Sequence, residues 1–404
     1  MVDGQVRPLT ATSEAVVELR SILTARARIG SVELLGELRD SRAYGNDVDS
    51  ALVAGDVNAF EPVQARATID LADMAGEGTQ LRLTLGRTGL DLGGRRLVAM
   101  GDYRNAAVFF TGAHATLVTR GDGDIDLFWA MPQTRQPNRR DAVLDNRPAL
   151  DRERLAQQIF GMVALFPVGR NLEVGGSLIG LRESDRPDFP TRNRQLWTLG
   201  PRILKSPAAG QADFEVEAFL QRGESAPPGN PNGAAVPVRA GMVRAVAGYS
   251  WYGPLSPRLA LEFDAISGDR PGEEDNRFDQ LFGARRFEFG PSSIYGVVGR
   301  ANLVSPALRF SFQQPGRADG WVIARGLWSS SATDFFSTSG VRDPDGDSGR
   351  FAGVQVDARA RLWLVPGHLR ADLNMTGLSR RGVLENAAPG RQSLYVGSAV
   401  EAFF

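Results

Sequence analysis

Arginine is the residue type with which this chain could do the most chemistry. The 404 residues carry 46 Lys+Arg against 47 Asp+Glu, and Lys205 is the only lysine in the sequence. A guanidinium binds a carboxylate through two parallel hydrogen bonds, whereas an ammonium acts as a point charge. A row of guanidinium groups lining a channel would pass a carboxylated solute along without trapping it. The arginines that share the polar face of predicted strands are therefore our candidates for substrate-contacting, pore-lining residues: Arg20, Arg26, Arg28, Arg66, Arg82, Arg87, Arg194, Arg202, Arg244, Arg309, Arg359, Arg361 and Arg370.

The same arginines have a structural alternative, because an unpaired buried charge is costly. Acidic residues on the same predicted faces could neutralise them across neighbouring strands: Glu18, Glu33, Glu37, Asp70, Glu215, Glu217, Glu262, Asp264, Asp357 and Asp372. For each arginine, ion pairing and substrate contact are therefore both possible roles at this point.

Several other chemistries lack their usual residues. With no Cys and only two His, the chain offers no thiol catalyst, disulfide framework or Cys/His zinc site. A formal net charge of −1 provides no basic field for nucleic acid. P-loop, nucleophile-elbow and dinucleotide-binding motifs are absent from the sequence. We therefore expect no cofactor and no enzymatic activity.

One acidic segment has the alternating carboxylates of a calcium loop, at Asp343, Asp345 and Asp347. Ser348 and Val354 stand where a calcium hand needs glycine and glutamate. We interpret the segment as a solvated external loop, with loose Ca²⁺ binding as the alternative.

The elements that must position the arginines are strands, because apolar and polar residues alternate strictly over ten or so residues at a time. Val63, Ala65 and Ala67 oppose Gln64 and Arg66, for example. This pattern predicts about 18 strands: 2–12, 14–28, 31–44, 60–74, 79–91, 107–119, 123–132, 155–166, 171–182, 192–204, 211–221, 239–252, 258–268, 306–314, 319–330, 350–365, 367–378 and 391–404.

The predicted links alternate between long and short from the third strand onward, as in outer-membrane barrels with short periplasmic turns and long external loops. The first strand is the weakest prediction, because Pro8 interrupts it. We expect one all-β domain over residues 1–404, an antiparallel transmembrane β-barrel. Long loops 92–106, 222–238 and 269–305 are candidate constrictions.

The hydropathy of the chain agrees with such a barrel. Its mean hydropathy of −0.20 looks soluble, but a barrel averages lipid-facing apolar and lumen-facing polar residues. No run of about 18 apolar residues occurs, which excludes a transmembrane helix. The N-terminus has no signal segment, so the chain is either cytosolic or a mature form with an added initiator Met.

The C-terminal strand supports the outer-membrane interpretation, because Leu394, Val396, Val400 and Ala402 alternate up to a terminal Phe404. We expect this strand to be recognised by the barrel-assembly machinery. Aromatic residues near strand ends would form girdles at the level of the lipid headgroups, and the candidates are Trp129, Trp197, Trp251, Tyr252, Trp321, Trp328 and Trp363.

The strand at 79–91 changes phase, because its leucines are odd-numbered up to Leu85 and even-numbered from Leu90. A one-residue bulge at Gly86 would repair the alternation. Arg87 and Asp91 would then both face the lumen.

The sequence resembles the alginate-export family of outer-membrane channels. The resemblance rests mainly on Gly86-Arg87-Thr88-Gly89-Leu90, then Gly93-Gly94-Arg95-Arg96-Leu97-Val98, Arg104-Asn105 and Gly112. Further collinear matches extend it over roughly residues 30–404: Leu38-Arg39-Asp40-Ser41-Arg42 with Tyr44, Ser267-Gly268-Asp269, Phe278-Asp279-Gln280-Leu281-Phe282, Ala301-Asn302-Leu303, and Ser331-Ala332-Thr333-Asp334 with Ser339-Gly340. Thr88 departs from the family's usual glutamine.

The resemblance implies a bacterial outer-membrane channel that conducts or exports an anionic or polar solute, such as an alginate-like acidic saccharide. It adds Asp91, Arg95, Arg96, Arg104 and Asn105 to the candidate pore-lining residues. A less selective uptake porin for small carboxylates or aromatic acids is the first alternative. An outer-membrane hydrolase using lumen carboxylates, or a soluble all-β binding protein, is the alternative of a different class.

Overall fold

Alternating sequence becomes strand almost everywhere that the pattern predicts it. The computed structural model describes residues 14–45, 50, 52–169, 171–227, 233–284, 288–290, 295–386 and 392–404. Within them lie seventeen strands: β1 (Val17–Ile29), β2 (Val32–Tyr44), β3 (Asn58–Ala72), β4 (Gln80–Thr88), β5 (Phe110–Val118), β6 (Asp124–Pro132), β7 (Gln157–Pro167), β8 (Leu172–Glu183), β9 (Gln195–Lys205), β10 (Gln211–Ser225), β11 (Val236–Ser250), β12 (Arg258–Ile266), β13 (Leu303–Gln314), β14 (Ala318–Trp328), β15 (Phe351–Val365), β16 (Leu369–Arg380) and β17 (Gln392–Ala402). The strand predicted at 2–12 lies outside the described residues.

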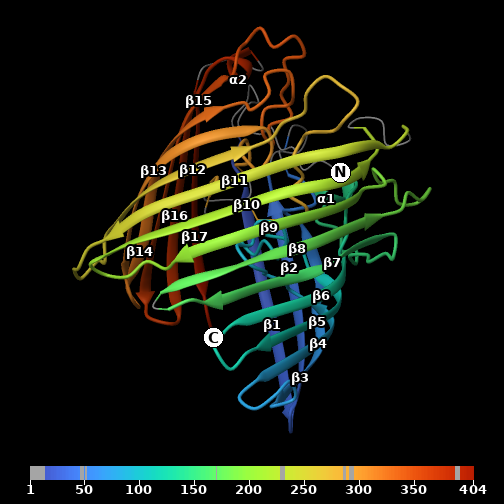
Figure 1. The fold of residues 1–404 in the computed structure, drawn as a ribbon, viewed down its shortest axis with the longest axis vertical. Helices are drawn as coiled ribbons and strands as arrows, with labels where there is room; N and C mark the ends of the chain where they lie inside the picture. Colours follow the sequence, from blue (N-terminus) through green and yellow to red (C-terminus); the bar gives the residue numbers. More distant parts are fainter. Residues whose placement is uncertain are drawn as a thin grey trace.

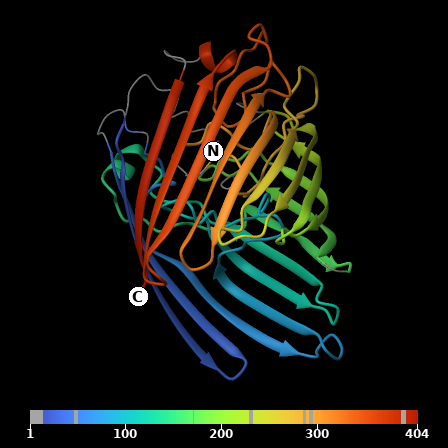
Figure 2. The same ribbon diagram turned by 90° about the vertical axis from the view of Figure 1, so that its left-hand side faces the viewer.

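Each strand pairs antiparallel with the next along the chain, from β1 to β17, in one continuous sheet. Figures 1 and 2 show this sheet curled round on itself, with β17 brought to the side of β1. Short links such as 30–31 and 366–368 gather at one end, while the other end carries long links such as 89–109 and 267–302. The predicted alternation of link lengths is therefore confirmed.

Within the described residues, helix is confined to two short segments, α1 (Arg140–Leu144) and α2 (Val383–Asn386). No helix in the described part of the chain is long and apolar enough to cross a membrane.

The outer face of the sheet is an apolar belt. Leu199, Leu220 and Leu261 are each more than half exposed, as lipid-facing side chains of a barrel must be. Trp129 and Trp197 lie on this face near the long-loop end, and Trp251 with Tyr252 lies at the short-turn end. These positions are those of the two headgroup-level girdles of a membrane barrel.

Two of the predicted girdle residues face the other way. Trp321 stands opposite Arg359 in the ladder of β14 and β15, and Trp363 stands opposite Arg370. Directly opposed residues share a face, and Arg359 is buried inside the barrel. The girdle prediction is wrong for both indoles, because nearness to a strand end does not fix which face a side chain occupies.

The interior of the barrel contains the core. Inward side chains of β5–β16 pack with long-loop residues in one buried apolar cluster, which includes Leu92, Val98, Phe289, Val297 and Phe336. Predicted constrictions 92–106 and 269–305 therefore supply buried side chains to the lumen. Segment 222–238 is different, because β10 continues to Ser225 and β11 begins at Val236, and residues 228–232 lie outside the described part.

The bulge predicted at Gly86 is wrong. The ladders of β4 with β3 and with β5 run through Gly86 in unbroken register. The leucine phase changes because β4 ends at Thr88 and Leu90 already belongs to the loop core. Gly86 has a φ of +113°, and a Cβ there would collide with the carbonyl oxygen of Ala65, so glycine is the residue that fits this position.

Candidate functional site

Inner-face arginines fall into an exposed group and a buried group. The exposed group, here called the open row, consists of Arg26 and Arg28 on β1 and Arg82 on β4, together with the partly buried Arg66 on β3, whose side chain is 22% exposed. The side chains of Arg26, Arg28 and Arg82 are 62%, 64% and 61% exposed. Register places all four on the inner face, since Arg26 and Arg66 both oppose Leu35, which is buried.

The open row carries more guanidinium groups than carboxylates. Glu33 lies 3.7 Å from Arg26 and 3.8 Å from Arg66. Asp70 lies 2.6 Å from Arg82 and 3.9 Å from Arg28. Three of these four contacts are long, and exposed ion pairs contribute little stability. Four cations therefore share two carboxylates on an accessible surface.

The buried group forms a continuous ion network across the lumen. Arg96 of loop 89–109 reaches β10, where its guanidinium lies 2.8 Å from Glu215 and in contact with Glu217. The same guanidinium lies 2.8 Å from Glu288 of loop 267–302. Arg96 thereby joins two inserted loops to the barrel wall.

Glu288 also receives guanidinium groups from the wall and from its own loop. Arg244 of β11 lies 3.3 Å from it, and Arg300 contacts it directly. Burial by itself would raise the pKa of Glu288, but Arg244, Arg300 and Arg96 together hold that pKa well below its usual range. The carboxylate of Glu288 is therefore ionised at physiological pH, and its ion pairs with the three guanidinium groups persist.

The network extends along the wall of β9–β13. Arg244 pairs with Glu262 and Asp264, each at 2.8 Å. Glu262 is shared with Arg309 at 2.5 Å, and Glu215 with Arg202 at 2.9 Å. The arginines of this wall therefore have a structural role, in which they neutralise acidic side chains of neighbouring strands.

Three more of the arginines predicted to line the pore also form ion pairs with acidic side chains. Arg194 pairs with Glu183 at 2.6 Å and Asp279 at 2.5 Å. Arg359 contacts Asp372, and Arg361 lies 2.8 Å from Asp319.

The residues added by the family motif mostly stabilise loop 89–109. Asp91 accepts the backbone N–H of Met100 at 2.9 Å and lies 3.1 Å from Arg95. Asn105 donates from Nδ2 to the carbonyl oxygens of Arg42 and Asp56, at 2.9 and 2.8 Å.

Arg20 of β1 holds the same loop from the other side of the lumen. Its Nη1 donates to the carbonyl oxygens of Asp102 at 3.1 Å and Arg104 at 2.8 Å. Loop 89–109 is thus held by β1 at one end and by β10 at the other.

Arg87 has a different environment from the open row. Register places Arg87 opposite Ala65 and Thr111, and alternation along β4 gives it the same face of the strand as Leu85. Its guanidinium lies 2.6 Å from Glu61 and 2.5 Å from Glu153. Arg87 therefore joins β4 to β3 and to the loop at 133–156.

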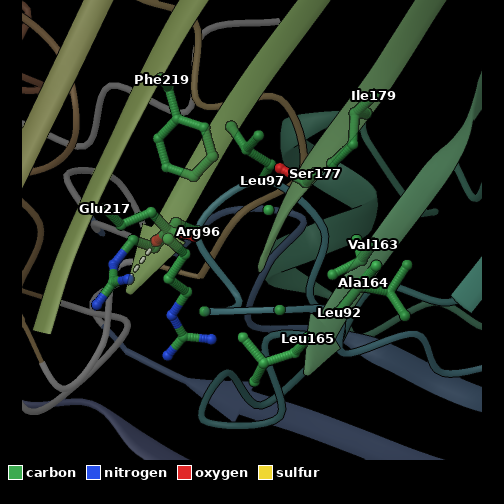
Figure 3. A pocket seen from close by; sticks show the side chains of 14 residues that line it. Leu92, Arg96, Leu97, Val163, Ala164, Leu165, Ser177, Ile179, Glu217 and Phe219 are labelled. Atoms are coloured by element: carbon green, nitrogen blue, oxygen red, sulfur yellow. Dashed lines mark hydrogen bonds and ion pairs between the residues drawn. The ribbon is translucent and has the colours of Figure 1, made fainter. Parts of the chain in front are cut away.

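A small cavity remains between loop 89–109 and the wall (Figure 3). Leu92, Val163, Ile179 and Phe219 supply its apolar lining. Figure 3 shows Arg96 and Glu217 together at its edge. The cavity marks an imperfect fit between inserted loop and barrel.

Sequence reasoning missed Glu288 and Arg300, although they complete the network. Both lie in loop 267–302, outside every strand, so alternation could not assign them to a face. Their buried contacts depend on the way in which the loop folds into the lumen.

No group of three or more acidic, His or Cys side chains that could hold a metal ion occurs within the described ranges. Asp343 accepts backbone N–H groups of Gly346 at 3.2 Å and Ser348 at 2.7 Å. These bonds, that to Ser348 foremost, lower the pKa of Asp343. Its carboxylate shapes the external turn.

Comparisons with known proteins agree with this architecture. A family model described as alginate export matches residues 5–390. The solved structure of OccK10 (OpdN) from Pseudomonas aeruginosa is similar over 97% of this chain and 97% of its own, with 13% identity and a TM-score of 0.57. A sequence comparison with curated proteins gives no match.

Two similar structures from the same organism contain ligands. OpdK, an outer membrane protein, with vanillate covers 96% of this chain and 97% of its own, with 12% identity and a TM-score of 0.55. OccK2 (OpdF) in complex with glucuronate covers 96% and 90%, with 13% identity and a TM-score of 0.53. At these identities the similarity establishes the fold, an outer-membrane β-barrel.

Proposed function

Because the chain belongs to the alginate export family and forms an outer-membrane channel for small solutes, we propose that it carries carboxylated solutes, acidic saccharides in particular. The observation that supports this proposal is the open row on β1, β3 and β4. The route runs along this side of the lumen.

The location of the route follows from how the lumen is filled. Inner-face residues of β14, β15 and β16, such as Arg325, Asp357 and Thr376, are almost completely buried beneath loops or neighbouring side chains. Every residue of β1 is exposed. Solvent therefore reaches the inner face mainly beside β1, where the open row stands.

The chemistry of the open row suits a passing anion. A carboxylate on the solute can replace a long contact to Glu33 or Asp70 with a bidentate one to a guanidinium. Four cations in sequence let the solute exchange partners step by step, and no site is closed enough to trap it. A polyuronate presents a carboxylate on each residue, which matches a repeated row.

The two ligands named in similar structures, glucuronate and vanillate, are both carboxylates. They support the solute class by analogy alone. Vanillate and the inserted loops favour the second candidate function, uptake of small carboxylates or aromatic acids.

A hydrolase is the less supported alternative. Glycosidase carboxylates need one protonated acid beside one ionised group. The inner carboxylates Glu262 and Asp264 are buried and both pair with Arg244, so neither is exposed to a glycosidic bond.

Block of single-channel current by oligouronates tests the proposal. The variant with Arg26→Gln, Arg28→Gln, Arg66→Gln and Arg82→Gln should need at least about tenfold more oligouronate for half-maximal block, because charge-assisted hydrogen bonds are lost. Arg42→Gln is the control, since Arg42 opposes the exposed Leu19 on the lipid side.

Equal block of the wild type and the fourfold variant would overturn the proposal. Block by small aromatic acids, with none by oligouronates, would instead select the second candidate.

A further inference from the structure

We propose that the lipid-facing side of β8, β10 and β11 binds the phosphates of a phosphorylated glycolipid in the outer leaflet of the outer membrane. The binding surface, here called the rim patch, consists of Arg182, Arg222 and Arg239. All three stand at the long-loop end of their strands; β10 and β11 lie side by side, and β9 lies between β8 and β10 (Figure 1). The long-loop end of an outer-membrane barrel is extracellular, so the patch lies at the level of the outer leaflet's headgroups.

Alternation along each strand places the rim patch outside the barrel. Arg222 shares its face with Leu220, which is 57% exposed, while the intervening Gln221 is buried. Arg182 likewise shares its face with the exposed Leu178, and Arg239 with the exposed Val243. Each guanidinium thus caps a column of lipid-facing apolar side chains.

The rim patch contains an unfavourable arrangement of charge. Arg222 and Arg239 stand directly opposite each other in the ladder of β10 and β11, and like charges in this position are destabilising. The side chain of Arg222 donates to the carbonyl oxygen of Gln221 at 3.0 Å. In the described part of the chain, neither Arg182 nor Arg222 has a carboxylate partner.

Two carboxylates stand nearby and compensate the three cations only in part. Glu274 lies 3.1 Å from Arg239, but their side chains are 37% and 61% exposed, and such a pair contributes little. Glu224 shares the outer face but stands opposite Gln195 and Pro237. A phosphate between the strands would offer three acceptor oxygens to the facing guanidinium groups.

The same cross-strand row continues into an aromatic surface. Ladder partners run from Arg222 to Trp197, Gly180, Phe160 and Trp129. Phe160 and Trp197 meet edge to face with ring centroids 5.4 Å apart. A Cβ at Gly180 would lie 2.6 Å from the Phe160 ring, so this glycine makes room for it.

A cationic half beside an aromatic half fits an amphiphile with an anionic head. Indole rings favour the headgroup level of a bilayer, and acyl chains would lie on the belt below them. Phosphate on a sugar head is the anionic group of the bacterial outer leaflet, which identifies a phosphorylated glycolipid as the occupant. The inference concerns the lipid side and does not depend on which solute the lumen carries.

Native mass spectrometry of the detergent-solubilised barrel, titrated with bis-phosphorylated lipid A, tests the proposal. The variant with Arg182→Gln, Arg222→Gln and Arg239→Gln should bind lipid A about tenfold to a hundredfold more weakly, since each basic residue at an anionic surface contributes about a tenfold effect at most. Arg317→Gln is the matched control, because Arg317 is an exposed cation in the short turn between β13 and β14.

The wild type should also bind dephosphorylated lipid A and phosphatidylglycerol at least about tenfold more weakly than the bis-phosphorylated form. Equal affinity for either of these lipids overturns the proposal, and so does wild-type affinity in the triple variant. Heat-modifiable gel mobility shows whether each variant is folded, and the single substitution Arg222→Gln replaces the triple variant if that chain fails to assemble.

Discussion

Burial and partner number decide what an arginine does in this barrel. Arg244 is 5% exposed at its side chain and lies near three carboxylates, so it is a structural cross-link. Arg26 is 62% exposed and has one carboxylate at 3.7 Å. Removing one member of a buried ion network leaves uncompensated charge, at a cost of about 3–5 kcal/mol, whereas an exposed pair contributes about 0–1 kcal/mol.

Arg96 offers the clearest test of structural pairing. Arg96→Ala should lower the free energy of unfolding by about 3–5 kcal/mol, because Glu215, Glu217 and Glu288 lose a shared cation. Loop 89–109 should then leave the wall and raise single-channel conductance. Arg95→Ala is the control, since Arg95 pairs with Asp91 and Asp102 of its own loop. Unchanged conductance in Arg96→Ala would show that the loop does not narrow the channel.

A buried carboxyl in the loop at 133–156 predicts a pH dependence. Burial, and then the nearby charge of Glu61, raise the pKa of Asp151 to about 7. Asp151 accepts the N–H of Gln136 at 2.7 Å, and its own N–H donates to Glu61 at 3.0 Å. Because an unfolded aspartate has a pKa of about 3.9, the loop loses stability as pH rises from about 4 to about 7.

Hydrogen-exchange protection factors measure this effect. Protection in the loop at 133–156 should fall between pH 5 and pH 8, and Asp151→Asn should remove the dependence because it cannot ionise. Equal protection at both pH values would show that Asp151 titrates in its ordinary range.

At the scale of elements, the alternation of apolar and polar residues predicted all seventeen strands of the described residues. It could do so because one face of each strand meets lipid and the other meets the lumen. The pattern failed where the chain leaves the sheet. Leu90 seemed to require a bulge in β4, but it packs in the loop core. The path of loops 89–109 and 267–302 depends on contacts distant in sequence, such as Arg96 with Glu288, and no periodicity encodes such contacts.

The two C-terminal phenylalanines, Phe403 and Phe404, allow membrane assembly and folded-state stability to be tested separately. Phe403 packs against Trp363 with ring centroids 5.6 Å apart, and its N–H donates to the carbonyl oxygen of His368 at 2.8 Å. Phe404 follows β17 and is fully exposed. Deleting Phe404 should therefore reduce insertion into the outer membrane in cells, yet leave the melting temperature of the folded barrel within about 2 °C.

Phe403→Ala is the comparison variant, and it should lower the free energy of unfolding by about 1–3 kcal/mol through lost ring packing. Normal insertion after deletion of Phe404 would show that the assembly machinery does not use this residue.

At the scale of the whole molecule, the lumen is asymmetric. Loops 89–109 and 267–302 supply the side chains that fill it against the wall of β5–β16, while β1 stays exposed along its whole length. The net charge of −1 is a total over the whole chain, so it does not show that paired arginines lie on one side of the lumen and surplus arginines on the other. We therefore propose that a minority of the arginines, those of the open row, determines ion selectivity.

Reversal potential across a planar bilayer under a salt gradient tests that assignment most directly. The wild type should prefer anions, and the fourfold variant of Arg26, Arg28, Arg66 and Arg82 to Gln should lose that preference, because Glu33 and Asp70 then remain as the charges of the open row. The lipid-side control Arg42→Gln should keep the wild-type value. A fourfold variant with the reversal potential of the wild type would contradict the account.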